Sequence, residues 1–160
     1  MAIESAAVIC DAAICAVLCR IAVRDWQTQL IANQSLCLLA VLAWMRALIA
    51  GSGILESFIG MSLCFLFLAV LFFAGEGLIG AGDVKLAGAL GIWLGWPDAA
   101  PALCLSFILG GAAAAACLVL RFKNRSDHIA FAPFMAVSAA AMHFCGTEIV
   151  CFWQSAVEFL

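Results

Sequence analysis

Six long apolar runs, separated by short polar connections, dominate this chain; they cover residues 5–23, 30–50, 54–74, 84–96, 101–120 and 129–145. A membrane-spanning helix needs about 20 consecutive apolar residues, and most of the runs approach that length. With 68% hydrophobic and 11% charged residues, the chain has too little polar surface to cover a soluble globule. The pattern predicts an all-α membrane protein: a polytopic bundle of about six transmembrane helices.

No repeat or linker divides the sequence, so we expect a single integral membrane domain over residues 1–160. Residues 147–160 are too few to cross a bilayer easily. They are expected to form a short C-terminal helix that lies at the interface or packs on the bundle. The lipid bilayer is therefore a partner, whereas a net charge of -3 gives no indication of nucleic-acid binding.

Basic residues predict how the spans are oriented, because Lys and Arg near span ends favour the cytoplasmic side. If the first span runs inward, Arg46 alone of the seven basic residues lies near the outer side. The N-terminus is then external, and so is the C-terminal segment after an even number of spans. No basic stretch precedes the first run, which we expect to be retained rather than cleaved as a signal peptide. The six basic residues assigned to the cytoplasmic side are Arg20, Arg24, Lys85, Arg121, Lys123 and Arg125.

The fourth run is too short for a full crossing, because its helix would rise only about 20 Å. Glycine-rich residues 75–82 precede it. Irregular backbone can enter a membrane where it lines a watery cavity, so we expect this stretch to dip below the cytoplasmic interface. Asp83, directly after it, would then be reachable by water but shielded from bulk solvent.

A carboxylate in such a place is costly unless it has a partner, water or a function. Asp25, at the inner end of the first span, is the natural partner for Asp83. Glu76 and Asp127 are the other acidic residues on that side, whereas Asp11 lies about 21 Å from Asp25 along a helix. Two carboxylates at one site share a proton, so that one acts as base and the other as acid. Such a pair of carboxyl groups can activate a water molecule to attack a peptide carbonyl.

Two sequence motifs contain Asp83 and Asp25, and a third lies at the start of the last apolar run. Residues 80–86 read Gly-Ala-Gly-Asp-Val-Lys-Leu, and residues 25–33 read Asp-Trp-Gln-Thr-Gln-Leu-Ile-Ala-Asn. They resemble the two motifs of the prepilin peptidases, or type IV leader peptidases, which are intramembrane aspartic proteases of the GxGD class. Ala32 replaces the proline of that family's Ile-Pro-Asn, and Ala132-Pro133-Phe134 is a weaker third similarity. The resemblance covers about residues 14–140.

The resemblance implies an aspartic endopeptidase of a bacterial inner (cytoplasmic) membrane that removes the short basic leader from type IV prepilins at the cytoplasmic face. Asp25 and Asp83 would be catalytic, with no metal or cofactor. The sequence is similar to short members of the family, associated with Flp (tight-adherence) pili, and has no paired CxxC motif; we therefore expect cleavage without methyl transfer. Supporting or substrate-binding roles are expected for Gly80, Gly82, Lys85, Asn33 and Pro133.

Several of these roles have structural alternatives. Lys85 is expected first of all to mark the cytoplasmic end of its helix. Asn33 either hydrogen-bonds the loop after Asp25 or caps a helix. Glycines in 91–95 and 110–111 offer close helix packing, with a homodimer face as the functional alternative. His143 and the nine cysteines are expected to be structural.

Two other classes of protein also fit an apolar chain with embedded carboxylates. A small transporter or channel would use Asp25 and Asp83 to bind ions or protons. Both aspartates lie at the inner end, however, and no mid-span acid continues a path across the membrane. A non-catalytic assembly subunit would leave the paired aspartates without a reason.

Overall fold

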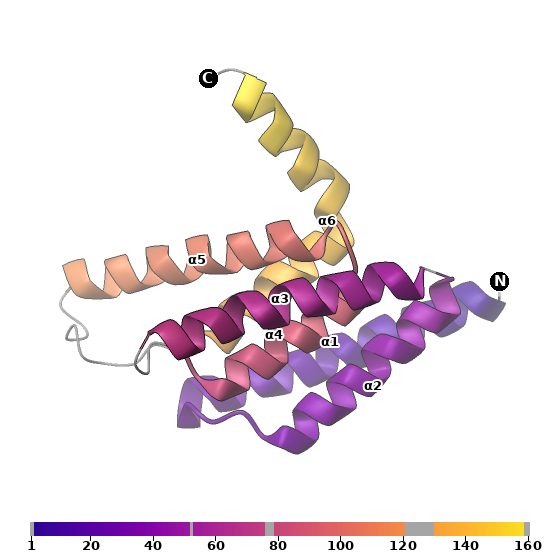
Figure 1. Ribbon diagram of the computed structural model, residues 1–160, viewed down its shortest axis with the longest axis horizontal. Coiled ribbons are helices and arrows are strands. Elements are labelled where there is room, and N and C mark those ends of the chain that lie inside the picture. Colours follow the sequence, from indigo (N-terminus) through magenta and orange to yellow (C-terminus); the bar gives the residue numbers. More distant parts are fainter. Residues whose placement is uncertain (1, 52, 76–78, 121–129, 159–160) are drawn as a thin grey trace.

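The computed structural model describes residues 2–51, 53–75, 79–120 and 130–158. These residues form six α-helices and no strand, as the apolar runs predict (Figure 1). The helices are α1 (Ala2–Thr28), α2 (Asn33–Ala50), α3 (Ile54–Ala74), α4 (Ala81–Leu94), α5 (Ala99–Val119) and α6 (Ala132–Glu158).

Four of the helices in the described part of the chain are long and apolar enough to cross a membrane, namely α1 from Ile3, α2, α3 and α5. The sequence predicted about six such helices. Helix α4 has 14 residues and is as short as its run indicated. Helix α6 has non-helical backbone angles at Cys145, with φ −128° and ψ 17°, so it consists of two helical parts joined at a kink. The chain is thus an all-α membrane protein in which two of the helices differ from simple spans.

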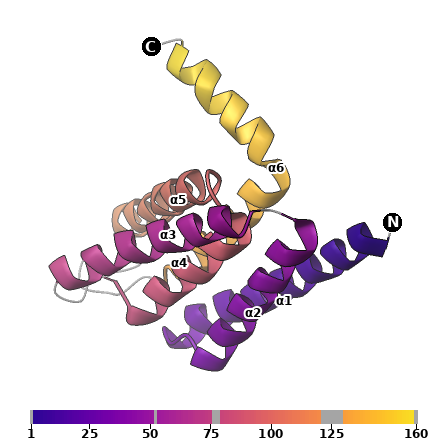
Figure 2. The same cartoon turned by 45° about the vertical axis from the view of Figure 1, so that its right-hand side comes forward.

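Successive helices run in opposite directions, which gives the bundle two distinct ends (Figures 1 and 2). The first is the Asp25 end, where α1, α3 and α5 finish and where α2, α4 and α6 begin. At the other, the Asp11 end, lie the N-terminus and the kink of α6. Helix α4 packs mainly against α3 and α2, and α1 packs against α2 and α6. After the kink, the last part of α6 leaves the bundle rather than packing on it.

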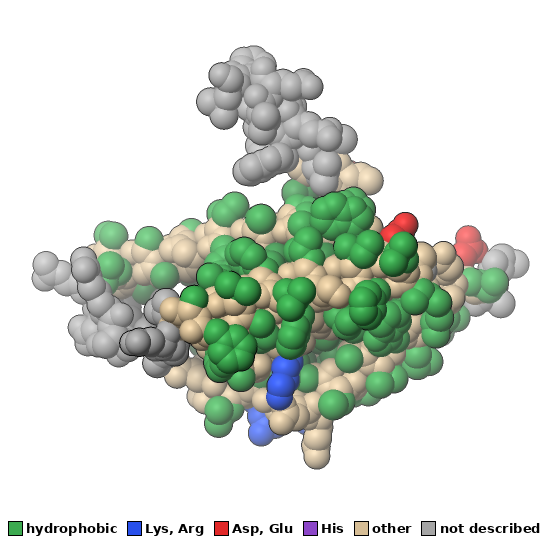
Figure 3. Space-filling model, viewed as in Figure 1, with side chains coloured by type: hydrophobic (Ala, Val, Ile, Leu, Met, Phe, Trp, Pro, Cys, Tyr) green, Lys and Arg blue, Asp and Glu red, His purple; other side chains and the backbone are tan. Residues whose placement is uncertain are grey.

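The outer surface of the bundle is mostly apolar, as a lipid environment requires. On the face shown in Figure 3, green apolar side chains spread over α2 and α3. Phe58, Val70 and Phe73 are among the exposed large side chains. On the same face, Lys and Arg atoms lie near the start of α2 and α4, and Asp and Glu atoms lie toward the N-terminus.

Helices α3 and α4 cross at two glycines. A Cβ atom placed on Gly91 would lie 2.6 Å from the carbonyl carbon of Gly60 and 2.8 Å from the nitrogen of Met61. Such distances are shorter than any real side chain tolerates, so only glycine permits this approach. The close packing predicted for residues 91–95 is confirmed at Gly91. In 110–111, Gly110 packs on Phe131, whereas Gly111 faces open space.

Two predicted boundaries were wrong near the site. Helix α1 continues to Thr28, beyond the apolar run that stops at 23, so Asp25 lies inside the helix. Helix α4 begins at Ala81, three residues before the apolar run that starts at 84, so Asp83 lies in its first turn. Residues 146–158 form the helical part of α6 beyond its kink, so the short C-terminal helix expected from the sequence is present as the second part of α6. Of the expected irregular stretch 75–82, residues 76–78 lie outside the described part of the chain.

Candidate active site

Asp25 lies in the last turn of α1 and is almost completely buried, with 5% of its surface exposed. Its Oδ2 accepts a hydrogen bond of 3.2 Å from the backbone N–H of Ala132. Ala132 is the first residue of α6 and is fully buried. The N-terminus of a helix carries unpaired N–H groups and a partial positive charge. Asp25 therefore sits where a carboxylate is stabilised by the start of another helix.

Asp83 lies in the first turn of α4, after the N-cap residue Gly80. Its backbone N–H donates to the carbonyl oxygen of Gly80 at 3.0 Å. The carboxylate folds back over this glycine, because a Cβ on Gly80 would lie 3.2 Å from Oδ2 of Asp83. Oδ1 of Asp83 is buried and has no hydrogen-bond partner among the described residues. A buried, unsatisfied carboxylate oxygen is costly in a folded protein and calls for an explanation.

The two aspartates lie at the same end of the bundle, and the charge of Asp25 acts on the Asp83 carboxyl group. They reach this end on different helices. In the described chain, no Cα atom of α1 comes within 8 Å of a Cα atom of α4. The two side chains thus lie at one end of the bundle on helices whose backbones are not in contact. Two carboxyl groups in such a place can hold one proton between them.

Gly82 brings the two sequence motifs together. A Cβ on this residue would lie 3.1 Å from the Cβ of Ile31, which belongs to the connection between α1 and α2. Any larger residue would push this connection away from the first turn of α4. The packing of Gly82 on Ile31 therefore helps to keep the segment after Asp25 next to the segment that carries Asp83.

Lys85 and Asn33 form a second link between the motifs. The Lys85 Nζ donates a hydrogen bond of 3.1 Å to Oδ1 of Asn33, and both residues are exposed. Asn33 is the first residue of α2, whose N-cap is Ala32 without a side-chain cap bond, so its interpretation as a helix cap was wrong. Lys85 does lie at the start of its helix, but it also joins α4 to α2.

Pro133 follows Ala132 in the first turn of α6 and is half-buried. Proline suits this position because the N–H groups of a first turn have no partner inside the helix. The amide that binds Asp25 thus comes directly before the proline of the third motif. A direct role for Pro133 in binding substrate stays a prediction. The competing carboxylates Glu76 and Asp127 lie outside the described residues.

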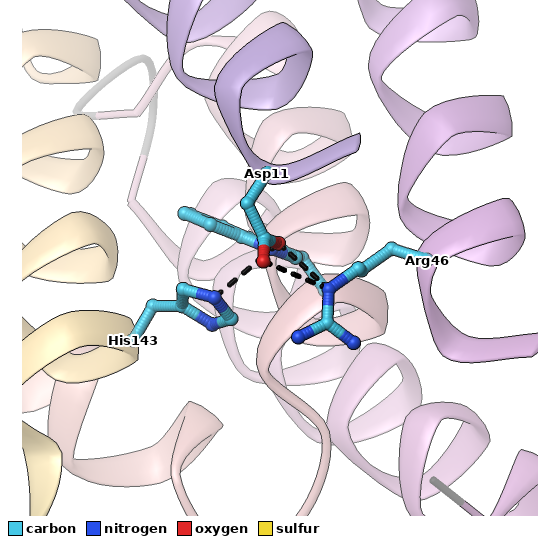
Figure 4. Close-up of polar contacts among 4 residues, drawn as sticks. Asp11, Arg46 and His143 are labelled. Carbon is cyan, nitrogen blue, oxygen red and sulfur yellow. Dashed lines mark hydrogen bonds and ion pairs between the residues drawn. The ribbon is translucent and has the colours of Figure 1, made fainter. Parts of the chain in front are cut away.

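A polar cluster that was not predicted from the sequence lies at the opposite end of the bundle. Asp11, which is 8% exposed, lies between Arg46 and His143 (Figure 4) and also contacts Trp93. The Arg46 Nε is 2.9 Å from both carboxylate oxygens. One signal was present in the sequence: Asp11 and Arg46 are opposite charges inside consecutive apolar runs, at similar expected depth. His143, expected to be structural, contacts Asp11 through Nε2 at 3.3 Å.

The comparison with known proteins agrees with the two motifs at residues 25–33 and 80–86. The family model described as the type IV leader peptidase family matches residues 12–115, which include both Asp25 and Asp83. The chain belongs to the type IV leader peptidase family. The match covers α1 from residue 12 onward, all of α2 to α4 and most of α5.

Relatives in this family carry the name prepilin leader peptidase/N-methyltransferase. The one from Burkholderia pseudomallei is 42% identical over 85 residues, which are 52% of this chain and 27% of that protein. The one from Aeromonas salmonicida is 32% identical over 92 residues, 58% of this chain and 32% of that protein. The one from Bacillus subtilis is 30% identical over 95 residues, 59% of this chain and 38% of that protein. The chain thus aligns with about a third of the length of these relatives. No solved structure matches it.

Proposed function

We propose that this chain is an intramembrane aspartic endopeptidase that removes the short basic leader of type IV prepilins. Membership of the leader peptidase family supports the class of reaction. The observation that carries the proposal is that Asp25, in the last turn of α1, and Asp83, in the first turn of α4, lie at one end of the bundle. The proposed location is a bacterial inner membrane, with the Asp25 end toward the cytoplasm. The basic residues Arg20, Arg24 and Lys85 at this end support that orientation.

The two aspartates have different surroundings, which suggests different roles. Asp25 accepts the Ala132 N–H, an interaction that favours its charged form. We assign it as the base that takes a proton from the attacking water. Asp83, in its protonated form, would give its proton to the carbonyl oxygen of the peptide bond. The water oxygen bonds to the carbonyl carbon, and collapse of the resulting diol breaks the C–N bond as a proton passes to the leaving amine.

The position of the site fits a substrate that is itself a membrane helix. Asp25 is in the last turn of α1 and Asp83 in the first turn of α4, so the reaction would occur near the bilayer interface. A peptide bond at the end of a transmembrane segment can reach such a site, whereas one at mid-bilayer cannot. This geometry agrees with cleavage between a cytoplasmic leader and an apolar helix. Flp prepilins are the proposed substrates, on the resemblance to the short members of the family.

The proposal is tested with the purified chain in lipid vesicles, incubated with a prepilin and with methyl-labelled S-adenosylmethionine. We expect the leader to be released, seen as a loss of mass, with no label on the new N-terminus. A prepilin that remains intact would overturn the peptidase proposal, and a labelled product would overturn the proposal of cleavage without methylation. Ion flux that depends on Asp25 and Asp83 in the same vesicles would instead favour the transporter alternative.

The bond between Lys85 and Asn33 should contribute modestly to this activity. Replacing Lys85 by leucine removes the donor, and a typical hydrogen bond contributes about 1 kcal/mol, so we expect kcat/KM to fall about fivefold. Asn33→Ala should have the same effect, and the double variant should be no worse than either single variant. Additive losses in the cycle would contradict the idea that the two side chains act as a pair.

A further inference from the structure

The polar cluster around Asp11 lies far from the proposed chemistry but joins four helices. The side chains come from α1 (Asp11), α2 (Arg46), α4 (Trp93) and α6 (His143), and they converge on one carboxylate (Figure 4). Oδ1 of Asp11 accepts the indole N–H of Trp93 at 3.0 Å and lies 3.3 Å from Nε2 of His143. The rings of Trp93 and His143 stack with their centroids 4.4 Å apart.

The cluster is too far from the aspartate pair to touch the substrate's reacting bond. Asp11 precedes Asp25 by fourteen residues on α1, which corresponds to about 21 Å along the helix axis. The side chains of Asp11 and Arg46 are 11% and 19% exposed, so the ion pair is mostly enclosed by the bundle. A buried, fully partnered ion pair often fixes one arrangement of the elements that supply its members.

The helices joined by this cluster are also the helices that build the candidate active site. Helix α1 carries Asp25, α4 carries Asp83, and α6 supplies the Ala132 amide that binds Asp25. Because the backbones of α1 and α4 are not in contact in the described chain, their relative position is set through α2 and α6, which pack on both, and through side chains that reach from one to the other. The hydrogen bond between Trp93 and Asp11 connects these two helices directly.

We propose that Asp11, together with Arg46, Trp93 and His143, is a positioning centre. It fixes α1, α4 and α6 relative to one another at the Asp11 end, so that Asp25 and Asp83 meet at the other end. The proposal deepens the proposed peptidase function and rests on it for the kinetic part of its test. Arg46 and His143 hold the carboxylate in place, and Trp93 ties it to the helix of Asp83.

The matched pair of variants Trp93→Phe and Trp96→Phe tests this proposal. The first removes the hydrogen bond to Asp11 while keeping a large apolar ring. The second makes the same change at an exposed tryptophan, whose backbone N–H bond to Glu56 is retained. We expect Trp93→Phe to lower kcat about tenfold with KM unchanged, since small misplacements of catalytic groups are costly. Trp96→Phe should match the parent chain.

A second variant, Arg46→Gln, leaves the buried Asp11 carboxylate without its ion-pair partner. It should lower kcat about a hundredfold relative to the parent chain, which is a larger loss than that expected for Trp93→Phe. If Arg46→Gln fails to accumulate in the membrane, Trp93→Phe still tests the proposal, because it leaves the ion pair intact. An unchanged kcat in Trp93→Phe, or an effect confined to KM, would overturn it.

Amide hydrogen exchange supplies a readout that needs no substrate. In Trp93→Phe we expect faster exchange in the peptide that contains Ala132, because a shifted α1 no longer presents Asp25 to that amide. Unchanged exchange at Ala132 would overturn the coupling between the two ends. If the parent chain cleaves no prepilin, the proposed function fails, while the exchange result still decides whether the Asp11 centre positions the Asp25 end.

Discussion

Replacing Asp83 by asparagine is expected to abolish prepilin cleavage while leaving the protein inserted and abundant. The amide has the size of the carboxyl group but cannot donate the carboxylic proton assigned to Asp83. General acid–base catalysis by one positioned group contributes up to about ten thousandfold, and the remaining group cannot work alone, so we expect a loss of about a thousandfold or more. Cleavage of a co-expressed prepilin, followed by its mass, measures the effect.

Asp25→Asn should cause a loss of similar size for a different reason. The amide oxygen can still accept the Ala132 N–H, which keeps the start of α6 in place, but the base is gone. Because each change removes a half-buried or buried carboxyl group without leaving a charge unpaired, neither should reduce the folded amount of protein. Both variants together should be no worse than either one, as expected for groups that act as a unit.

Asp98→Asn is the matched control for these substitutions. Asp98 precedes α5 at the Asp11 end and its side chain makes no cap bond, so the same chemical change should leave cleavage at the parent rate. Measurable processing by Asp25→Asn or Asp83→Asn, at levels above a chain that lacks both, would show that the two aspartates are not the catalytic pair.

Much of the fold could be predicted because membrane spans are read from length and hydrophobicity alone. The run 54–74 coincides with α3 (Ile54–Ala74), since glycines border it on both sides. The ends of α1 and α4 could not be found in this way. Both helices continue into polar residues at the Asp25 end, and a hydrophobic run stops where polar residues begin even when the helix does not.

The candidate site, too, has features that could be predicted from the sequence and features that could not. The two aspartates could be assigned to one end of the bundle from the sequence, because opposite helix directions and the basic residues place Asp25 and Asp83 there. The hydrogen bond from Ala132 to Asp25 could not be predicted, because it joins residues 107 positions apart through a backbone atom. The Asp11 cluster could not be predicted from the sequence for a related reason. Trp93 and His143 look like ordinary apolar-run residues until packing brings them to a carboxylate on another helix.

A substitution at the crossing of α3 and α4 is expected to have the second large effect, which is a loss of stability. Gly91→Ala places a Cβ 2.6 Å from the carbonyl carbon of Gly60 and 2.8 Å from the nitrogen of Met61. Both are backbone atoms, so the contact is relieved only if the helices separate. Overpacking of a well-packed core costs about 1–3 kcal/mol, and we expect about 3 kcal/mol or more here because no side chain can rotate away. Thermal unfolding in detergent measures the loss as a lower Tm.

Gly111→Ala is the control for this prediction. Gly111 lies inside α5 and a Cβ there meets nothing within 4 Å, so the substitution should be neutral or stabilise by about 0.5–1 kcal/mol through helix propensity. An unchanged Tm in Gly91→Ala would contradict the tight crossing.

The same substitution should also affect cleavage, because it displaces the helix that carries one of the two aspartates. Because α4 carries Asp83 and does not contact the backbone of α1, a displacement of α4 at Gly91 is not corrected by direct packing on α1. Gly91→Ala should therefore lose cleavage at temperatures well below its own Tm, whereas Gly111→Ala should keep it.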